Sequence, residues 1–188
     1  LSLFKNSGLE DQEVKEVDLD VDLAQYIRNI PDFPQLGVQF KDITTLLKDG
    51  MAFRETIERL VGIFEDKGVE LVVGIEARGF IIGAPLAYSL GCGFVPVRKA
   101  GKLPAPTLSK TYDLEYGSAT LEIHRDAIEK GQKVIIVDDL LATGGTTKAV
   151  CEMVEELGGK IIGIGFVIEL ESLKGREKLS SYPVHSLI

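Results

Sequence analysis

Residues 134–147 read VIIVDDLLATGGTT and form the most informative segment of the chain. Four apolar residues suited to a buried strand come first, two aspartates follow, and a Gly/Thr turn then opens a helix predicted over 145–157. Ligands of parallel sheets bind beyond the carboxyl ends of the strands. The pattern therefore predicts that Asp138 and Asp139 project into a binding crevice.

The Gly/Thr turn supplies the second half of this predicted site. Gly144 and Gly145 allow the backbone to approach an anion, and the unpaired N–H groups at the helix start, Thr146 and Thr147, would point at a phosphate. The helix dipole favours one acid in such a loop by about 0.3–1 kcal/mol, but it explains a pair less well. The combination predicts a sugar-phosphate site. The P-loop and GxGxxG patterns are absent from the sequence, which argues against nucleotide hydrolysis by a P-loop.

Short apolar runs alternate with helical patterns over the rest of the chain. Strands are expected at 71–75, 94–98, 133–137 and 160–168, helices at 19–29, from Asp49 to Gly68 and at 80–90, and a hairpin at 111–116 and 119–124 around Gly117-Ser118. Such alternation predicts an α/β fold with a mostly parallel twisted sheet and helices on both faces.

Composition narrows the classes of function. The chain has 188 residues, 45% of them apolar, and 21 basic against 29 acidic residues, a balance of −8. One globular domain is expected, and binding to nucleic acid or to an anionic membrane is disfavoured. Residues 77–112 nevertheless carry five basic residues and no acidic one, which predicts a local anion site.

Cysteine usage and hydropathy bear on the compartment. Cys92 and Cys151 lack metal-binding or redox spacing and are read as buried free thiols, and the first thirty residues lack the pattern of a signal peptide. We therefore expect a reducing cytoplasm. The uncharged run at 79–97 is interpreted as two elements and not as a membrane span, because Gly91, Gly93 and Pro96 interrupt it.

The acidic pair followed by LLATGGT resembles the phosphoribosyl-diphosphate signature of the type I phosphoribosyltransferases. The resemblance extends from about residue 23 to residue 188, and further segments narrow it to the adenine phosphoribosyltransferase family; these are 33–43, 76–80, 98–104, 114–117 and 173–179. It implies a single phosphoribosyltransferase domain over 1–188, with an N-terminal extension (1–20), a base-binding hood (31–45), a basic loop with a flexible hairpin lid (98–124) and the phosphoribosyl-diphosphate motif (134–147).

The resemblance implies the reaction of adenine with 5-phosphoribosyl 1-diphosphate to give AMP and diphosphate, in purine salvage. Mg²⁺ would be held mainly by the substrate and water, without direct protein ligands. The 5′-phosphate would bind the segment of Ala142, Thr143, Gly144, Gly145 and Thr146. Asp138 and Asp139 would take the ribose hydroxyls and stabilise the positive charge that develops at C1′. Arg78, Lys99 and Lys102 would bind the diphosphate, and Arg78 is also counted as catalytic.

For the base, the resemblance implies stacking on Phe40 and Leu170, with the Gln39 backbone reading the edge that distinguishes adenine from 6-oxopurines. Lys41 stands where several members of the family have Arg and lacks its planar fork. Glu115 would handle a purine proton, and Tyr116 would help the hairpin to close over the reacting bond. A homodimer is expected, and neither nucleic acid nor membrane is an expected partner.

Two alternatives remain open. A regulatory protein could bind phosphoribosyl diphosphate without turning it over, although the acidic N-terminal residues oppose a DNA-binding role. A phosphoribosyltransferase could also use guanine, hypoxanthine or orotate, although the segments of Phe40 and Leu170 favour adenine.

Overall fold

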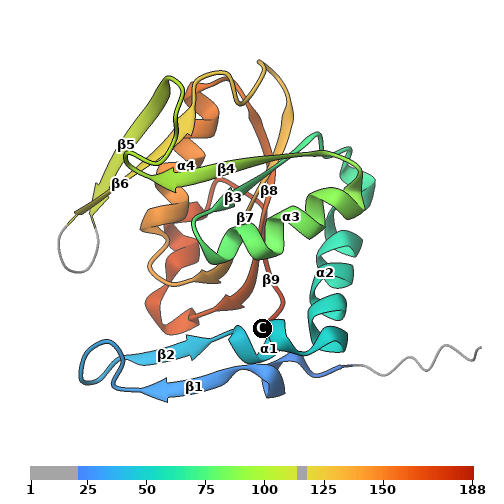
Figure 1. The fold of residues 1–188 in the computed structure, drawn as a ribbon, viewed down its shortest axis with the longest axis vertical. Helices are drawn as coiled ribbons and strands as arrows, with labels where there is room; N and C mark the ends of the chain where they lie inside the picture. The colour runs from blue at the N-terminus through green and yellow to red at the C-terminus, as the bar shows by residue number, and fades with distance from the viewer. Residues whose placement is uncertain (1–20, 114–117) are drawn as a thin grey trace, which may run out of the picture.

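The computed structural model describes residues 21–113 and 118–188. A seven-stranded sheet of order β5-β6-β4-β3-β7-β8-β9 forms its centre (Figure 1). Its parallel strands are β4 (Gly93–Lys99), β3 (Leu71–Ile75), β7 (Lys133–Leu141), β8 (Lys160–Glu169) and β9 (Val184–Ser186). The hairpin of β5 (Thr107–Asp113) and β6 (Ser118–His124) joins the edge strand β4 in antiparallel orientation.

Helices cover both faces of the sheet, as the alternation of patterns predicted. One apolar core lies between the sheet and α2 (Gly50–Phe64) with α3 (Arg78–Leu90). The other lies between the sheet and α4 (Gly145–Glu156). Because successive strand residues face opposite sides, β7 contributes Ile135 to the first core and Ile136 to the second.

The start of α2 follows the predicted capping. The side chain of Asp49 accepts hydrogen bonds from the amides of Met51 and Ala52, at 3.0 and 2.9 Å. A 3-10 turn, η2 (Glu65–Lys67), extends the helix and ends at Gly68, whose φ of +65° is the left-handed conformation that glycine adopts readily.

The N-terminal region differs from the prediction. Within the described part, the helix predicted over 19–29 is one 3-10 turn, η1 (Leu23–Tyr26), followed by strand β1 (Arg28–Pro31). This strand pairs antiparallel with β2 (Gln39–Asp42), and the short helix α1 (Thr44–Lys48) follows. Pairing between segments separated in sequence outweighed the local helical spacing, so the hood is a small β-hairpin.

The C-terminal region and the hairpin of β5 and β6 differ from the sequence-based prediction in smaller details. Ser118 pairs with Asp113 and belongs to β6, so it is not part of the predicted two-residue junction at Gly117-Ser118. After β8, two 3-10 helices, η3 (Glu171–Leu173) and η4 (Gly175–Leu179), lead to β9. The uncharged run at 79–97 forms parts of α3 and β4, and no helix in the described ranges is long and apolar enough to span a membrane.

Candidate active site

The acidic pair lies inside strand β7 and not beyond its end, because β7 stays paired with β8 as far as Leu141. Asp139 is 3% exposed, and its Oδ2 accepts a hydrogen bond from Arg78 Nε at 2.5 Å. Asp138 is partly buried and its Oδ1 accepts the amide of Asp139 at 2.9 Å. The predicted strand end at residue 137 is therefore wrong, and Asp139 pairs with Arg78 within the protein, although both acids line one cavity.

Asp138 lies in a confined environment. Burial raises the pKa of its carboxyl well above the usual range, and the neighbouring charge of Asp139 raises it further. A side chain on Gly79, in the first turn of α3, would come within 2.9 Å of Asp138 Oδ1. The start of α3 thus packs directly against this carboxylate, without forming an ion pair with it.

The predicted phosphate cradle connects β7 to α4. Gly144 caps α4 with a φ of +75°, and a Cβ there would lie 2.5 Å from the carbonyl oxygen of Gly175. The amides of Thr143 and Gly144 donate to no backbone carbonyl of the described residues, and the first amides of α4 have no intrahelical acceptor. Gly144 therefore serves a close contact with η4 as well as leaving N–H groups free for an anion.

A cavity of about 310 Å³ contains the acids. Its lining comes from the end of β3, the start of α3, the hairpin, β7 and α4, and consists of Ile75, Glu76, Ala77, Arg78, Tyr112, Asp138, Asp139 and Thr146. Residues from separate segments of the sequence thus line one cavity. Its lining includes carboxylates, a guanidinium and Thr146 of the cradle.

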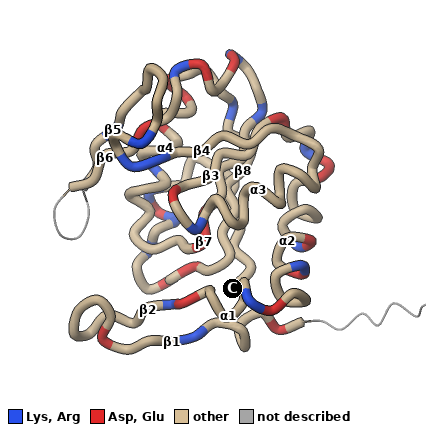
Figure 2. The backbone as a smooth tube through the Cα atoms, viewed as in Figure 1, with Lys and Arg blue, Asp and Glu red and all other residues tan. Residues whose placement is uncertain are grey.

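The basic segment is less free than its sequence suggested. Glu76, just before it, accepts hydrogen bonds from Lys102 Nζ and Arg98 Nε, and from the Lys99 amide at 3.0 Å. Arg78 pairs with Asp139, and Lys110 Nζ lies 2.6 Å from Glu152 of α4. Figure 2 shows acidic and basic positions close together at this edge. Carboxylates from other elements therefore neutralise most of the predicted anion site.

Glu76 is the centre of this charge pairing. Burial raises the pKa of its carboxyl, but the hydrogen bonds from Lys102 and the Lys99 amide, with the charges of Lys102 and Arg98, lower it below its usual value. The Lys99 side chain is exposed and makes no hydrogen bond or ion pair with the residues that the structure describes. Neither Lys99 nor Lys102 lines the acidic cavity, so the structure connects them to it only through Glu76.

A second cavity, of about 490 Å³, brings the predicted base-binding residues together. It is lined by the hood, by the start of α3, by β7 and the cradle, and by the segment after β8, namely Pro34, Gln35, Val38, Gln39, Phe40, Lys41, Arg78, Leu140, Ala142, Thr143, Thr146, Leu170 and Leu173. Arg78 and Thr146 line both cavities. The apolar hollow therefore adjoins the acidic one.

Phe40 lies between two partners at the hood. The rings of Phe33 and Phe40 form a T-shaped pair with centroids 5.1 Å apart, and the Arg78 guanidinium lies 5.5 Å from the centroid of the Phe40 ring. Lys41, beside it, donates to Asn29 Oδ1 on the opposite strand at 2.6 Å, so its amine is already bound within the hood. Arg78 thus contacts both the acidic pair and the hood.

Two predicted residues, Glu115 and Tyr116, lie outside the described residues. The structure adds residues that the sequence reasoning did not assign, among them Glu76, Tyr112, Leu140 and Gly175. Glu76 and Gly175 lie in segments that carry the family resemblance, which was the available signal. Within residues 21–113 and 118–188, no three His, Cys, Asp or Glu side chains gather into a metal-binding group.

Comparison with known proteins shows the family to which this fold belongs. Residues 42–187 match the family model of the phosphoribosyl transferase domain. The chain is 59% identical to an adenine phosphoribosyltransferase of Clostridium tetani over 89% of this chain and 98% of that protein. The crystal structure of the Thermoanaerobacter pseudethanolicus adenine phosphoribosyltransferase is 57% identical, with a TM-score of 0.86 over 88% of this chain and 96% of that one.

A more distant solved structure extends the agreement. The Saccharomyces cerevisiae adenine phosphoribosyltransferase, complexed with an imino-altritol bisphosphate and adenine, is 43% identical with a TM-score of 0.84, over 88% of this chain and 96% of that one. The predicted fold and enzyme class are confirmed by these similarities. This chain belongs to the adenine phosphoribosyltransferase family and is an enzyme of the pentosyltransferase class.

Proposed function

We propose that this chain transfers the phosphoribosyl group of 5-phosphoribosyl 1-diphosphate to N9 of adenine, giving AMP and diphosphate. One observation carries the proposal: the acidic and apolar cavities adjoin each other and share Arg78 and Thr146. An activated pentose in the first and a flat base in the second would meet at this boundary. The C1′–O bond to diphosphate breaks and the C1′–N9 bond forms.

The acidic cavity suits the pentose. Asp138 and Asp139 would accept hydrogen bonds from the 2′- and 3′-hydroxyls. Their charges would stabilise the positive charge that grows at C1′ as diphosphate leaves. The 5′-phosphate would bind the backbone amides of residues 142–146. The unpaired amides of Thr143 and Gly144 support this role.

Arg78, Lys99 and Lys102 would bind the leaving diphosphate. Arg78 and Lys102 are paired with carboxylates in the structure, so binding would exchange one anionic partner for another. Such an exchange keeps cations ordered before the substrate arrives and releases Asp139 from Arg78 for the pentose. Lys99, whose side chain is exposed, can approach the diphosphate without first leaving a partner.

The apolar cavity suits adenine. Phe40 and Leu170 would hold the faces of the ring, and the backbone of Gln39 would read its N1 and amino edge. Lys41 lines the same cavity, although its amine is bound to Asn29. We propose that Glu115 takes the proton from N9 and that Tyr116 helps to exclude water from the reacting bond.

Magnesium is the cofactor that a diphosphate substrate implies. The donor set fits it, because Asp138 and Asp139 line the acidic cavity and Asp138 forms no ion pair with the described residues. Mg²⁺ commonly keeps waters and substrate phosphates among its ligands, so these two carboxylates would hold it mainly through the bound substrate. When bound, the ion would neutralise part of the negative charge of the diphosphate.

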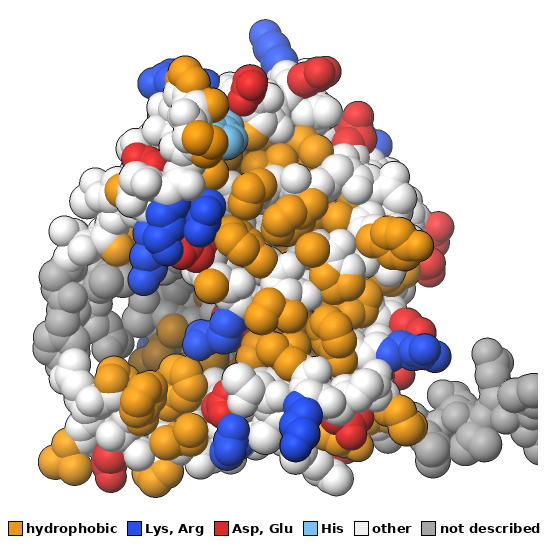
Figure 3. Space-filling model, in the orientation of Figure 1, with side chains coloured by type: hydrophobic (Ala, Val, Ile, Leu, Met, Phe, Trp, Pro, Cys, Tyr) orange, Lys and Arg blue, Asp and Glu red, His pale blue; other side chains and the backbone are white. Residues whose placement is uncertain are grey.

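We further propose one domain that forms a homodimer in a reducing cytoplasm. The exposed side of α3 supports the dimer, since Ile81 is 44% and Tyr88 is 88% exposed, and apolar side chains gather on this face (Figure 3). Cys92 and Cys151 are free thiols, the state that a reducing compartment maintains.

Purified protein with Mg²⁺, phosphoribosyl diphosphate and one nucleobase at a time tests the proposed reaction. Products are separated by chromatography and diphosphate is measured in parallel. We expect AMP from adenine, with equimolar diphosphate, and no nucleotide from guanine, hypoxanthine or orotate.

The other outcomes identify the two alternatives. Nucleotide formed from another base would change the assigned substrate. Tight binding of phosphoribosyl diphosphate without product from any base would indicate a regulatory protein. A chelator should abolish product formation, and added Mg²⁺ should restore it.

A further inference from the structure

The hood is a separate two-stranded sheet. Among the described residues, β1 and β2 pair only with each other and with no strand of the seven-stranded sheet. Yet β2 carries Gln39, Phe40 and Lys41, which line the apolar cavity. Backbone pairing with the main sheet therefore does not position these residues, and side-chain contacts must do so, among them the contact of Arg78 with Phe40 and those where the hairpin meets α1.

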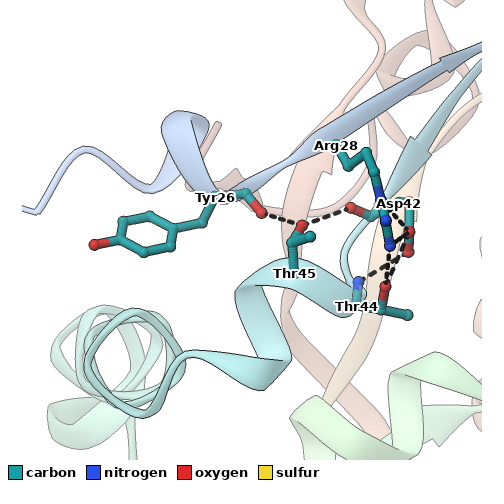
Figure 4. Close-up of polar contacts among 5 residues, drawn as sticks. All are labelled: Tyr26, Arg28, Asp42, Thr44 and Thr45. Carbon is teal, nitrogen blue, oxygen red and sulfur yellow. Dashed lines mark hydrogen bonds and ion pairs between the residues drawn. The ribbon is translucent and has the colours of Figure 1, made fainter.

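A network of side-chain hydrogen bonds occupies this base. Arg28, the first residue of β1, lies opposite Asp42, the last residue of β2. Its Nε and Nη2 donate to Asp42 Oδ2 at 3.0 and 2.7 Å, and Nη2 also donates to Thr44 Oγ1 at 3.1 Å. Figure 4 shows the guanidinium between the two residues.

The same network reaches α1. Asp42 Oδ1 accepts the amide of Thr44 at 2.9 Å, and Asp42 Oδ2 accepts its hydroxyl at 2.9 Å. Thr45 Oγ1 donates to the carbonyl of Tyr26 at 2.6 Å, which ties α1 to the residues before β1 (Figure 4). Leu46 of α1 is fully buried in the core below. Both strands of the hood are thus linked to an element anchored in the core.

Asp42 is the centre of the network. It accepts hydrogen bonds from two nitrogen atoms of Arg28 and from the amide and hydroxyl of Thr44, and its side chain is 13% exposed. The Thr44 amide, followed by the Thr44 hydroxyl, lowers the pKa of this carboxyl despite partial burial. Exposed ion pairs add little to stability, and Arg28 is 56% exposed. The geometry therefore favours a role in orientation over a role in stability.

We propose that Arg28, Asp42 and Thr44 form a hood clamp that positions Phe40 and Gln39 over the base. The inference rests on the proposed function. Phe40 lies two residues before Asp42 on β2, so the two side chains share one face of the hairpin. A change of tilt at Asp42 is carried directly to Phe40. The cradle and the acidic pair lie on β7 and α4, so the clamp would affect the binding of adenine and not the binding of the pentose.

Steady-state kinetics of Asp42→Asn test the clamp. The amide keeps the shape but loses the charge and one acceptor oxygen, so we expect the KM for adenine to rise about five- to tenfold. The KM for phosphoribosyl diphosphate should stay within about twofold, because the cradle is untouched. Arg28→Lys keeps the charge but lacks the planar guanidinium with its paired donors, so it should raise the KM for adenine by a smaller factor.

Glu177→Gln is the matched control, because it makes the same carboxylate-to-amide change in an ion pair whose side chains are 73% exposed. Hydrogen exchange followed by mass spectrometry adds a readout without activity, and faster exchange in Asp42→Asn should be confined to residues 28–42. A rise in both KM values by the same factor, or no rise in either, overturns the clamp. If Asp42→Asn does not fold, Arg28→Lys decides by the same criterion. If the wild-type protein forms no AMP, the proposed function is overturned. If the wild type forms AMP but the variants lack the expected KM pattern, only the clamp is overturned.

Discussion

In the proposed reaction the cradle would bind the 5′-phosphate and the hood would bind the adenine, and the two regions are held in different ways. The cradle follows directly from β7, between the two apolar cores, and its Gly144 packs on the backbone of Gly175. The hood is a short hairpin with nine consecutive exposed residues from Pro31 to Gln39, and side-chain hydrogen bonds hold its base. The phosphate end is therefore built on a rigid sheet, whereas the base end depends on a few polar contacts.

Arg78 joins these two regions. It pairs with Asp139 on the cradle side and lies over the ring of Phe40 on the hood side. Exchange of Asp139 for a diphosphate partner would therefore change a contact of the hood as well. The comparison predicts that substitutions in the cradle and in the hood separate the kinetic parameters of the two substrates.

The largest expected effect belongs to the acidic pair. Asp139→Asn removes a charge that the proposed function places beside C1′ and leaves Arg78 without its carboxylate, so kcat should fall by about a hundredfold or more. Asp138→Asn should lower kcat to a similar extent. Circular dichroism should show both variants folded, and unchanged kcat in both would contradict the assigned chemistry.

Asp138→Asn should also change the pH dependence of stability. Burial, and then Asp139, raise the pKa of Asp138 in the folded protein well above its ordinary value of 3.8. As the pH rises from 3.8 to that higher pKa, the unfolded chain loses the proton first and the folded state loses stability. The Tm of Asp138→Asn relative to wild type should therefore increase across this interval and level off above it. A difference that shrinks with rising pH would contradict the raised pKa.

A smaller effect is expected behind the cradle. In Gly175→Ala the new methyl group would meet the carbonyl oxygen of Ala142, and the backbone would have to shift. Such overpacking costs about 1–3 kcal/mol in the free energy of unfolding, and the KM for phosphoribosyl diphosphate should rise more than that for adenine. Denaturant unfolding and two-substrate kinetics measure both. Gly62→Ala, where a Cβ meets nothing within 4 Å, is the control.

The hood should show the opposite selectivity between the two substrates, with the smallest effect on stability. Phe40→Ala removes the proposed stacking surface, so the KM for adenine should rise about tenfold, since stacking on an aromatic ring contributes about 1–3 kcal/mol per base. Because Phe40 is only half-buried, the Tm should change little. Phe40→Leu keeps apolar volume without the aromatic face. An equal rise in the KM for phosphoribosyl diphosphate would remove the distinction between cradle and hood.

Local patterns were sufficient for much of the fold. The alternation of apolar runs and helical segments predicted the parallel strands β3, β4, β7 and β8 and the helices α2, α3 and α4, because burial on both faces leaves continuous apolar strands. The short parallel strand β9 was not predicted. Capping at Asp49 and the end at Gly68 were predicted from residue types alone. The hairpin form of the hood was not predicted, because the segment of β1 has helical spacing and becomes a strand only by pairing with β2.

The adjacency of two aspartates and a Gly-Gly turn is a property of consecutive residues, so the amino-acid order was enough to predict an anion and sugar site there. The amino-acid order did not predict that carboxylates from other elements pair with the cations of the basic segment. Glu76, Asp139 and Glu152 lie on other elements, and the folding of β3, β7 and α4 around the hairpin brings them to Lys102, Arg78 and Lys110. Electrostatic pairing depends on distance in space, and distances of this kind are set by packing between elements and not by position along the chain.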